Sequence, residues 1–468
     1  MKLPSSRSSR SLLTLAAVAT LAGCSMIPTY ERPAAPVAAQ WPVLSATATN
    51  EATVPAAELA WQDFIGDASL RELIRLALAN NRDLRVAVLN IEQVRATYQI
   101  RRADQFPTLN LAATGLRQPK TDGSGGIGSA YTAGLAMASW EIDFFGRVAS
   151  LKESALAQYL ATEEARKAAQ ISLIAAVANA WLSLQTNDEL LALTQRTLAT
   201  RDDSLRLTKL RLDNGAASAL DFRQAESLTA AARATLAQQR RLRALDVNAL
   251  TLLVGQPLPD ALLTSAGATF REVPTGLPSD LLQRRPDIRQ AEQQLIAANA
   301  SIGAARAAFF PRISLTASAG SASSELAGLF KDGSWGWTLA PQALLPIFDA
   351  GRNQANLSSA KVGRDIAVAQ YEKAIQTAFR EVADALAGRA TLGEQLQAQQ
   401  VQNDAEADRF RLADLRYRNG VASYLELLDA QRSLFGVQQA VAQTRLAYLQ
   451  NQVVLYKALG GGAPPPSP

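Results

Sequence analysis

The side chains that carry most enzyme and metal chemistry are scarce in this chain. Its 468 residues include a single cysteine, Cys24, and no histidine. A disulfide within the chain is therefore impossible, and histidine acid–base catalysis, histidine metal ligation and Cys/His nucleophile pairs are excluded. A hydrolase that uses carboxylates alone remains formally possible. We expect a protein that is not an enzyme, that binds no cofactor or metal, and whose one covalent modification is at Cys24.

The residues before Cys24 predict a lipoprotein signal peptide over residues 1–23. Three basic residues within the first ten precede a short apolar segment, residues 12–21, which is too short to span a bilayer as a helix. The segment ends in Leu21-Ala22-Gly23-Cys24, which resembles a bacterial lipobox and implies cleavage before Cys24 and its acylation. A buried free cysteine is the alternative. By analogy with bacterial lipoproteins, Ser25 at the next position favours anchoring in the outer-membrane lipid.

The charge of the chain gives no reason to expect a nucleic-acid partner. The formal net charge is +5, and removal of the signal segment with its three positive charges leaves +2. No cluster of Lys and Arg with interleaved aromatic residues is present. We therefore predict no nucleic-acid binding.

The same pattern occurs twice, at an offset of 204 to 205 residues. Phe106-Pro107 returns as Phe310-Pro311, and Asn214-Gly215 returns as Asn419-Gly420. A repeat of this length is too long for a solenoid unit, so it indicates duplication of a whole structural unit. The predicted segments are a signal peptide (1–23), an extended strap (24–66), the first repeat (67–255), a linker (256–278), the second repeat (279–460) and a disordered tail (461–468).

Each repeat contains two segments in which apolar and polar residues alternate. They lie at about 109–114 and 131–137 in the first repeat, and at 312–319 and 335–345 in the second. Each is close to the roughly 9–11 residues that a tilted strand needs to cross a bilayer. The alternative is an ordinary soluble sheet with two faces. No later stretch approaches 18 uninterrupted apolar residues, so we expect any membrane crossing to be made by strands.

The remaining sequence predicts long helices. From Ser69 to Ala103 the pattern is helical, and Val148 to about Asp213 contains neither Pro nor Gly. Sixty residues of helix measure about 90 Å, too long for a globular core, so apolar seams must pack as in coiled coils. The Asn-Gly pairs at 214–215 and 419–420 predict the turns of two helical hairpins.

Four strands are too few to close a barrel, because transmembrane barrels begin at about eight strands. An open sheet edge in lipid leaves backbone groups without hydrogen bonds, at several kcal/mol each. The chain is therefore predicted to form an oligomer around an axis. The predicted fold class is α+β: an internally duplicated membrane protein with four strands per chain and long helices around the same axis.

Several motifs carry a resemblance to a known family. The residues after the lipobox (Ile27 to Pro33), Arg284-Arg285-Pro286-Asp287-Ile288, and Tyr417-Arg418-Asn419-Gly420 followed by Leu427 to Ser433 resemble the TolC-like outer-membrane efflux family, in its OprM-type lipoprotein branch. The resemblance covers essentially all of the chain after residue 23. It implies a homotrimer with a 12-stranded β-barrel, a periplasmic α-helical barrel and a mixed equatorial domain.

The resemblance also implies partners and a function. The partners are a periplasmic adaptor (membrane fusion) protein and an inner-membrane RND transporter, in a Gram-negative bacterium. The function is that of a passive exit duct for drugs and other small toxic compounds. A duct for metal ions or for type I protein secretion, and a lipid-anchored coiled-coil structural protein without a pore, are the alternatives. The substrate range lies outside the sequence.

Polar residues near the hairpin turns are the candidate channel gate that the resemblance implies: Tyr417, Asp429 and Arg432 in the second repeat, and Asp221 in the first. By spacing alone, Asp429 and Arg432 are an i,i+3 pair on a solvated face, worth about 0.2–0.5 kcal/mol. The equivalents of Tyr417, Asp429 and Arg432 in the first repeat are Leu212, Gln224 and Ser227. The two hairpins have therefore diverged. Arg284, Arg285 and Asp287 are predicted to shape the start of the helix after Pro286.

Overall fold

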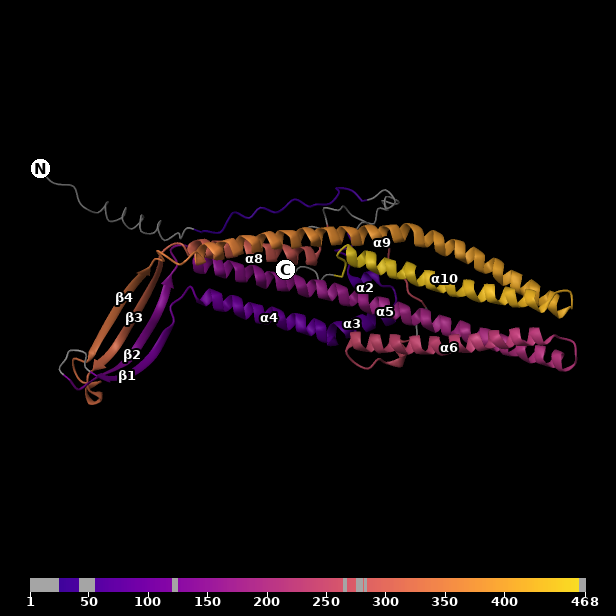
Figure 1. Cartoon of the computed structure of the whole chain (residues 1–468), viewed down its shortest axis with the longest axis horizontal. Coiled ribbons are helices and arrows are strands. Elements are labelled where there is room, and N and C mark those ends of the chain that lie inside the picture. Colours follow the sequence, from indigo (N-terminus) through magenta and orange to yellow (C-terminus); the bar gives the residue numbers. More distant parts are fainter. Residues whose placement is uncertain are drawn as a thin grey trace. The chain divides into compact units, whose positions relative to one another are not determined.

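The computed structural model describes residues 25–41, 55–119, 125–263, 267–274, 281 and 284–462. The predicted signal peptide and Cys24 lie outside these residues, as does the predicted tail from residue 463 onward. The two repeats are visible in the order of the elements (Figure 1), because each contains a helix, two strands and two long helices.

A short helix, α2 (Trp61–Phe64), lies near the end of the predicted strap, where the chain is helical and not extended as predicted. The elements of the first repeat are α3 (Ala68–Asn80), α4 (Arg82–Ala103), β1 (Leu109–Pro119), β2 (Ile127–Ile142), α5 (Arg147–Asp213) and α6 (Ala219–Val254). A 3-10 turn, η2 (Asp260–Leu262), follows. Those of the second repeat are α8 (Pro286–Ala307), β3 (Arg312–Ser323), η3 (Leu326–Gly328), β4 (Trp335–Leu344), α9 (Arg352–Arg418) and α10 (Tyr424–Ala458). Helices α5 and α9 have 67 residues each, as expected for a duplicated unit.

The helix predicted over residues 69–103 is in fact two helices. Asn81 has an extended backbone (φ −60°, ψ 130°) and ends α3. Its side chain accepts a hydrogen bond from the backbone N–H of Leu84 at 2.9 Å, so it caps α4. Its amide also donates to the carbonyl of Leu253 on α6 at 2.8 Å. Asparagine competes with helical backbone bonds in this way, and the apolar spacing across residues 69–103 does not reveal the break.

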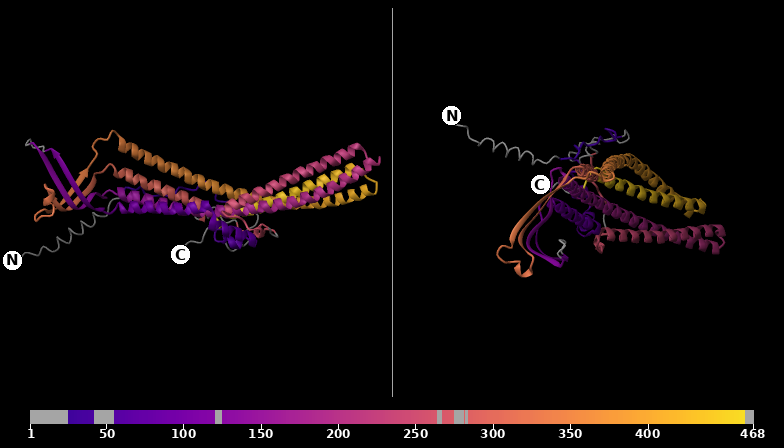
Figure 2. Two further views of the ribbon diagram at one scale, coloured as in Figure 1. Left: turned by 90° about the horizontal axis from the view of Figure 1, so that it is seen from below. Right: turned by 60° about the vertical axis from the view of Figure 1, so that its left-hand side comes forward.

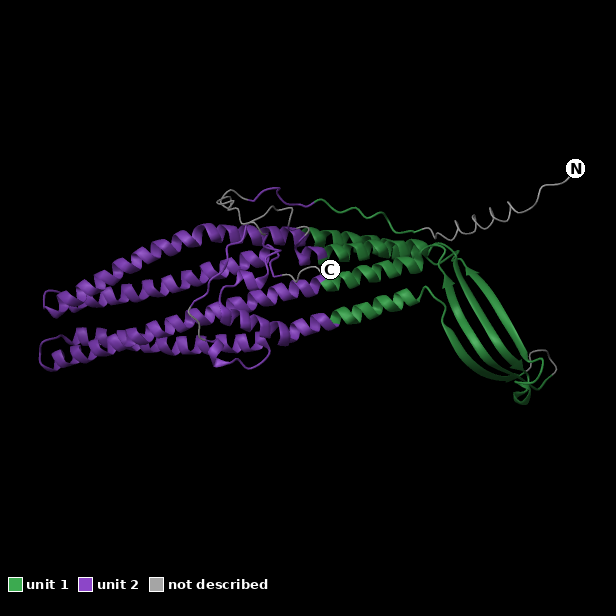
Figure 3. Ribbon diagram, turned by 180° about the vertical axis from the view of Figure 1, so that it is seen from behind, with its two compact units in different colours: residues 1–34, 90–163, 290–372 green, residues 35–89, 164–289, 373–468 purple. Residues whose placement is uncertain are grey.

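The chain forms two compact units, and each contains segments of both repeats (Figure 3). Unit 1 comprises Asn90–Glu163 and Gln290–Glu372 with the described part of residues 1–34, and unit 2 comprises Ala35–Leu89, Glu164–Arg289 and Lys373–Pro468. The duplicated sequence units are therefore not the compact units of the structure.

Unit 1 contains one antiparallel sheet in the order β1-β2-β3-β4 (Figures 1 and 2). The pairing of β2 with β3 joins the two repeats and shifts register between Met137 and Trp140. Large apolar side chains on the strands are exposed: Leu111 is 85% exposed and Trp335 is 70% exposed. In the sheet of this chain, β1 and β4 each pair along one edge only.

Residues 25–34 lie along the helices of unit 1 through specific contacts. Arg32 forms a two-point ion pair with Glu292 of α8, at 2.7 and 2.9 Å, and the hydroxyl of Tyr30 donates to the same carboxylate. Gly303 leaves space for the strap, because a Cβ there would lie 2.9 Å from the backbone nitrogen of Ile27. The part of the predicted strap next to Cys24 is thus seated on the protein.

Unit 2 contains two helical hairpins, α5 with α6 and α9 with α10. Both turns use a glycine with positive φ, Gly215 (71°) and Gly420 (77°), where a side chain would be strained. Ser218 and Ser423 then accept hydrogen bonds from backbone N–H groups in the first turns of α6 and α10. The reversals predicted at the two Asn-Gly pairs are confirmed.

One helix, α5, contains an 18-residue window that is long and apolar enough to cross a membrane, with a mean hydropathy of 1.2. Half of that window is buried inside the protein. Core helices that never enter a membrane share this property, so this window by itself does not make α5 a membrane span. Among the described residues, no other helix contains such a window.

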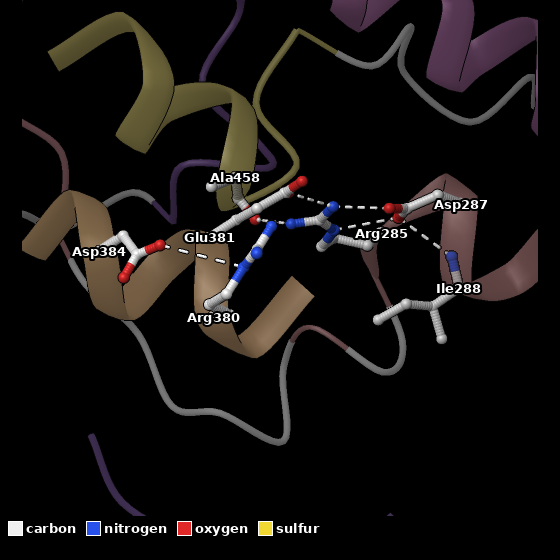
Figure 4. Close-up of polar contacts among 7 residues, drawn as sticks. All are labelled: Arg285, Asp287, Ile288, Arg380, Glu381, Asp384 and Ala458. Carbon is white, nitrogen blue, oxygen red and sulfur yellow. Dashed lines mark hydrogen bonds and ion pairs between the residues drawn. The ribbon is translucent and has the colours of Figure 1, made fainter. Parts of the chain in front are cut away.

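Arg285 joins three helices within unit 2 (Figure 4). Its side chain is buried and donates to Asp287 of α8, to Glu381 of α9 at 2.8 Å and to the carbonyl of Ala458 of α10 at 2.9 Å. Asp287 also accepts from the backbone N–H of Ile288, in the first turn of the helix. Burial alone would lower the pKa of Arg285, but Asp287 and Glu381 outweigh it and raise that pKa. The predicted structural role is confirmed for Arg285 and Asp287.

We predict that Arg285→Met lowers the stability of the protein by about 3 kcal/mol, because it leaves two carboxylates and a helix-end carbonyl without their shared donor. The measurement is the thermal midpoint of the helical circular dichroism signal in detergent. The control is Arg380→Met. Arg380 is an exposed arginine next to Glu381 in the sequence, and its guanidinium lies 4.0 Å from the carboxylate of Asp384. This substitution should cost less than about 0.5 kcal/mol. Equal midpoints for the two variants would contradict the role assigned to Arg285.

Candidate functional site

The predicted gate residues lie close to the ends of the two hairpins of unit 2. Tyr417 is in the last turn of α9, and Asp429 and Arg432 are in the second and third turns of α10. Asp221 is in the first turn of α6. The glycine turns and serine caps described above set where each helix begins, so they fix the positions of these side chains.

Tyr417 is part of the packing between the two hairpins rather than an exposed polar group. Its side chain is buried in an apolar cluster with Tyr424, Leu427 and Leu428. Arg211 of α5 donates a hydrogen bond to its hydroxyl at 2.7 Å, and the same guanidinium lies 4.8 Å from the centre of its ring. Tyr417 therefore connects α9 to α5 through one hydrogen bond and one cation–π contact.

Asp221 has a local role in the structure. Its carboxylate accepts hydrogen bonds from the backbone N–H and the hydroxyl of Ser218, at 3.2 and 2.8 Å. Ser218 in turn accepts from the backbone N–H of Asp221, which completes a capping box at the start of α6. All hydrogen bonds described for the Asp221 carboxylate are within this cap.

Asp429 and Arg432 do not pair with each other. Asp429 forms an ion pair with Arg409 on the neighbouring helix α9, and Arg409 also contacts Glu406 at 3.2 Å. The hydrogen bonds from Arg409 to Asp429 and Glu406 raise the pKa of the guanidinium. Arg432 is exposed and, among the described residues, has no hydrogen bond or ion pair. The simple i,i+3 interpretation of this pair is therefore wrong for Asp429, whose partner is on another helix.

A groove of about 780 Å³ lies where α6 and α10 meet. Asp429 and Arg432 line it from α10, and Gln224 and Ser227 line it from α6. These two pairs are the equivalent positions of the two repeats. The duplication therefore places corresponding residues on opposite walls of the same groove, so the first hairpin contributes to this site as well.

Arg201 of α5 also lines the groove, and the sequence analysis missed it. Only 6% of it is exposed, its Nη1 donates to the carbonyl of Leu228 at 3.0 Å, and its guanidinium lies 5.3 Å from the ring centre of Phe435. Burial lowers its pKa, and the positive charge of Arg432 lowers it further. A signal was present in the sequence: Thr194, Arg201 and Thr208 are seven residues apart, and all three are buried.

The chemistry available at the hairpin ends is binding and ion pairing. The groove offers guanidinium, amide, hydroxyl and carboxylate groups beside aromatic and aliphatic side chains. Within the part of the chain that the structure describes, no group of three or more acidic, Cys or His side chains is arranged to hold a metal ion. Such an arrangement can recognise a polar partner or ligand and can hold helices together.

Comparison with known proteins defines the class. The family model for outer membrane efflux proteins matches residues 73–256 and again residues 277–461, which correspond to the two repeats. The chain belongs to the outer membrane efflux protein family. This is a family of transport proteins of the Gram-negative outer membrane, and the chain is an outer-membrane efflux channel.

Individual relatives are similar over nearly their whole length. A toluene efflux pump outer membrane protein, TtgC of Pseudomonas putida, is 51% identical over 463 residues, which cover 97% of this chain and 96% of TtgC. The outer membrane protein OprJ of Pseudomonas aeruginosa is 48% identical, with 95% of this chain and 94% of OprJ covered. The open state of the MtrE outer membrane channel of Neisseria gonorrhoeae matches with a TM-score of 0.85 and 42% identity, over 94% of this chain and 99% of MtrE.

Proposed function

We propose that the chain forms a trimer that is the outer-membrane exit duct of a tripartite efflux pump. The observation that carries this proposal is the four-stranded sheet with two free edges. Its strands have 10 to 16 residues, enough for tilted strands to cross a bilayer. Unpaired backbone groups at the edges of β1 and β4 would each cost several kcal/mol in lipid. Pairing of β4 with β1 of the next copy removes this cost, and three copies give a closed barrel of twelve strands.

Exposed apolar side chains on α4 support an assembly of several copies. In the single chain, several apolar side chains of α4 are uncovered: Val88 is 43% exposed and Leu89 is 56% exposed. Near the other end of the helix, Ile100 is 61% exposed. Helices of neighbouring copies would cover this surface and so continue the barrel of strands as a barrel of helices.

The partners of this duct are an adaptor protein in the periplasm and an RND transporter in the inner membrane. Relatives named as outer membrane proteins of efflux pumps support this assignment. One is named for antibiotic efflux and others for toluene or solvent efflux, which supports drugs and small toxic compounds as substrates. The channel itself supplies no energy in this scheme, because the transporter drives export.

A lipid on Cys24 would fix the start of the strap in the outer membrane. The contacts of Tyr30 and Arg32 with Glu292, and the space at Gly303 for Ile27, support an anchor position close to unit 1. Several buried acyl chains make such an anchor durable, at about 0.8 kcal/mol per methylene.

We predict that Cys24→Ala abolishes acylation, because the chain has no other thiol. The measurement is incorporation of radiolabelled palmitate in growing cells, followed by the intact mass of the purified protein. Assembly should persist in part, since the strands have their own affinity for the membrane. Palmitate that still enters the variant protein would contradict the lipobox assignment.

We predict that the detergent-solubilised particle contains three copies of the chain. Closure of the barrel requires that every strand edge is paired, and the family resemblance selects three. Native mass spectrometry or light scattering with detergent correction provides the measurement. A stable monomer would contradict the architecture, and a trimer that never conducts ions in planar bilayers would favour the structural protein without a pore.

The gate is proposed to involve Asp429 and Arg432, with Tyr417 and Asp221 holding the hairpin ends in place. Asp429 and Arg432 are the two predicted gate residues whose side chains remain exposed and could reach a neighbouring copy. Charge-assisted hydrogen bonds contribute roughly 1.5–3 kcal/mol each, and threefold symmetry repeats them.

We predict that replacing both Asp429 and Arg432 with Ala raises single-channel conductance and admits large antibiotics such as vancomycin into cells. The helix itself should stay intact, because the pair makes no i,i+3 contact. The control is Asp202→Ala with Arg233→Ala, which removes an exposed ion pair (2.9 Å) between α5 and α6 outside the groove. It should leave conductance unchanged. Equal conductance of the folded double variant and the wild type would mean that Asp429 and Arg432 are surface residues with no role in the gate.

A further inference from the structure

The groove where α6 and α10 meet has an unusual balance of charge. Its lining includes three arginines, Arg201, Arg223 and Arg432, and one carboxylate, that of Asp429. Arg223 is paired with Glu226 at 2.6 Å, and Asp429 is paired with Arg409. Among the described residues, Arg201 and Arg432 therefore have no carboxylate partner, and the groove keeps two uncompensated positive charges.

Arg201 is the more informative of the two, because it is almost fully buried. A buried guanidinium normally has an anionic partner, since loss of water is costly for a charged group. Here the carbonyl of Leu228 and the ring of Phe435 compensate only in part, and the Nε atom has no hydrogen-bond partner in the described structure. Burial lowers the pKa of Arg201, and repulsion by the positive charge of Arg432 lowers it further. An anion between the two guanidinium groups would relieve both costs.

Apolar side chains also line the groove, beside polar residues such as Thr235 and Gln439. Leu228 and Ala231 lie on α6, and Leu425, Leu428 and Phe435 lie on α10. Leu425 is 61% exposed and therefore available to a ligand. The volume of about 780 Å³ is within the range of roughly 300–1,000 Å³ that is usual for sites of small organic molecules. A ligand that fits both features has an anionic head and an aromatic or aliphatic body.

We propose that this groove binds amphipathic organic carboxylates, with the carboxylate at Arg201 and Arg432 and the apolar body against Phe435 and Leu425. The groove is then a site for one chemical class of exported compound close to the hairpin ends. The assignment of the groove as a site for exported compounds rests on the proposed duct function. The prediction that the groove binds carboxylates does not depend on it. The Oε1 atom of Gln224 is buried without a hydrogen-bond partner, and a flip of the amide group would place Nε2 there as a donor to a bound carboxylate.

The experiment is isothermal titration calorimetry of the full chain in lipid nanodiscs with 2-naphthoate as the probe. The uncharged 2-naphthamide, which has the same ring system, is the matched ligand. We expect naphthoate to bind at least roughly tenfold more tightly than naphthamide, because a charge-assisted pair is made only by the carboxylate. Arg432→Gln should weaken naphthoate binding by roughly tenfold or more and leave naphthamide binding unchanged.

Arg432 is the preferred position for the test because it is exposed, so the variant should fold. Arg411→Gln is the control: this arginine is an exposed residue of α9, paired with Asp408 at 3.1 Å and outside the groove. Naphthoate should bind to this control as it does to the wild type. Arg201→Gln, checked for folding by circular dichroism, should weaken naphthoate binding in the same direction as Arg432→Gln.

Three results would overturn the proposal. They are absence of naphthoate binding to the wild type, equal affinity for naphthoate and naphthamide, and equal affinity of wild type and Arg432→Gln for naphthoate. Absence of naphthoate binding is also the result expected if a carboxylate of a second copy already occupies the groove, and in that case too the proposal is wrong. Conductance of the same preparations in planar bilayers is measured separately. If the protein conducts but binds no naphthoate, the proposed binding site is wrong and the duct function stands. If it binds naphthoate but never conducts, the duct function is wrong and the binding site stands.

Discussion

In the hydrocarbon of a membrane, every backbone N–H and C=O group must find a hydrogen-bond partner within the protein. The sheet of this chain meets that requirement along β2 and β3 and leaves one edge of β1 and one of β4 free. A single chain could satisfy these edges only outside a membrane. In the proposed trimer the oligomer is therefore part of the fold, and exposed apolar side chains on α4 are consistent with it, since Val88 and Leu89 have little cover within the chain.

Duplication produced two similar helical hairpins, whose sequences then diverged. One position at which the two repeats now differ in charge is especially informative. Arg201 of α5 has Glu406 of α9 as its equivalent 205 residues later. Glu406 is paired with Arg409, which also holds Asp429, whereas Arg201 is buried with a carbonyl and a ring as partners. Two copies of one helix have thus acquired opposite charges at the same position. Arg201 therefore adds uncompensated positive charge to the groove, whereas Glu406 has an arginine partner on its own helix, α9.

Much of the fold could be predicted from the sequence, because periodicity and turn chemistry are local signals. The four strands, the 67-residue helices and the glycine turns follow from alternation, from long stretches with few or no Pro and Gly, and from Asn-Gly pairs. The break at Asn81 was not predicted, since its cause is a side-chain cap and a contact with Leu253, far away in sequence. The cap role of Asp221 could have been read from its spacing to Ser218. The partner of Asp429 could not, because it depends on how α9 packs on α10.

Two buried arginines among the described residues of unit 2 show how stability is distributed along its helices. Arg285 has two carboxylates and a helix-end carbonyl as partners, and it ties α8, α9 and α10 together. Arg201 has no carboxylate partner among the described residues, and the seam around it contains Thr194 and Thr208 in place of large apolar side chains. A charged group that is fully compensated resists separation of its helices, and one that is partly compensated gains hydration when they part. We therefore expect separation of the hairpins to cost less near Arg201 than near Arg285. A gate made of helices needs such a difference, because one part of each hairpin must hold while the other moves.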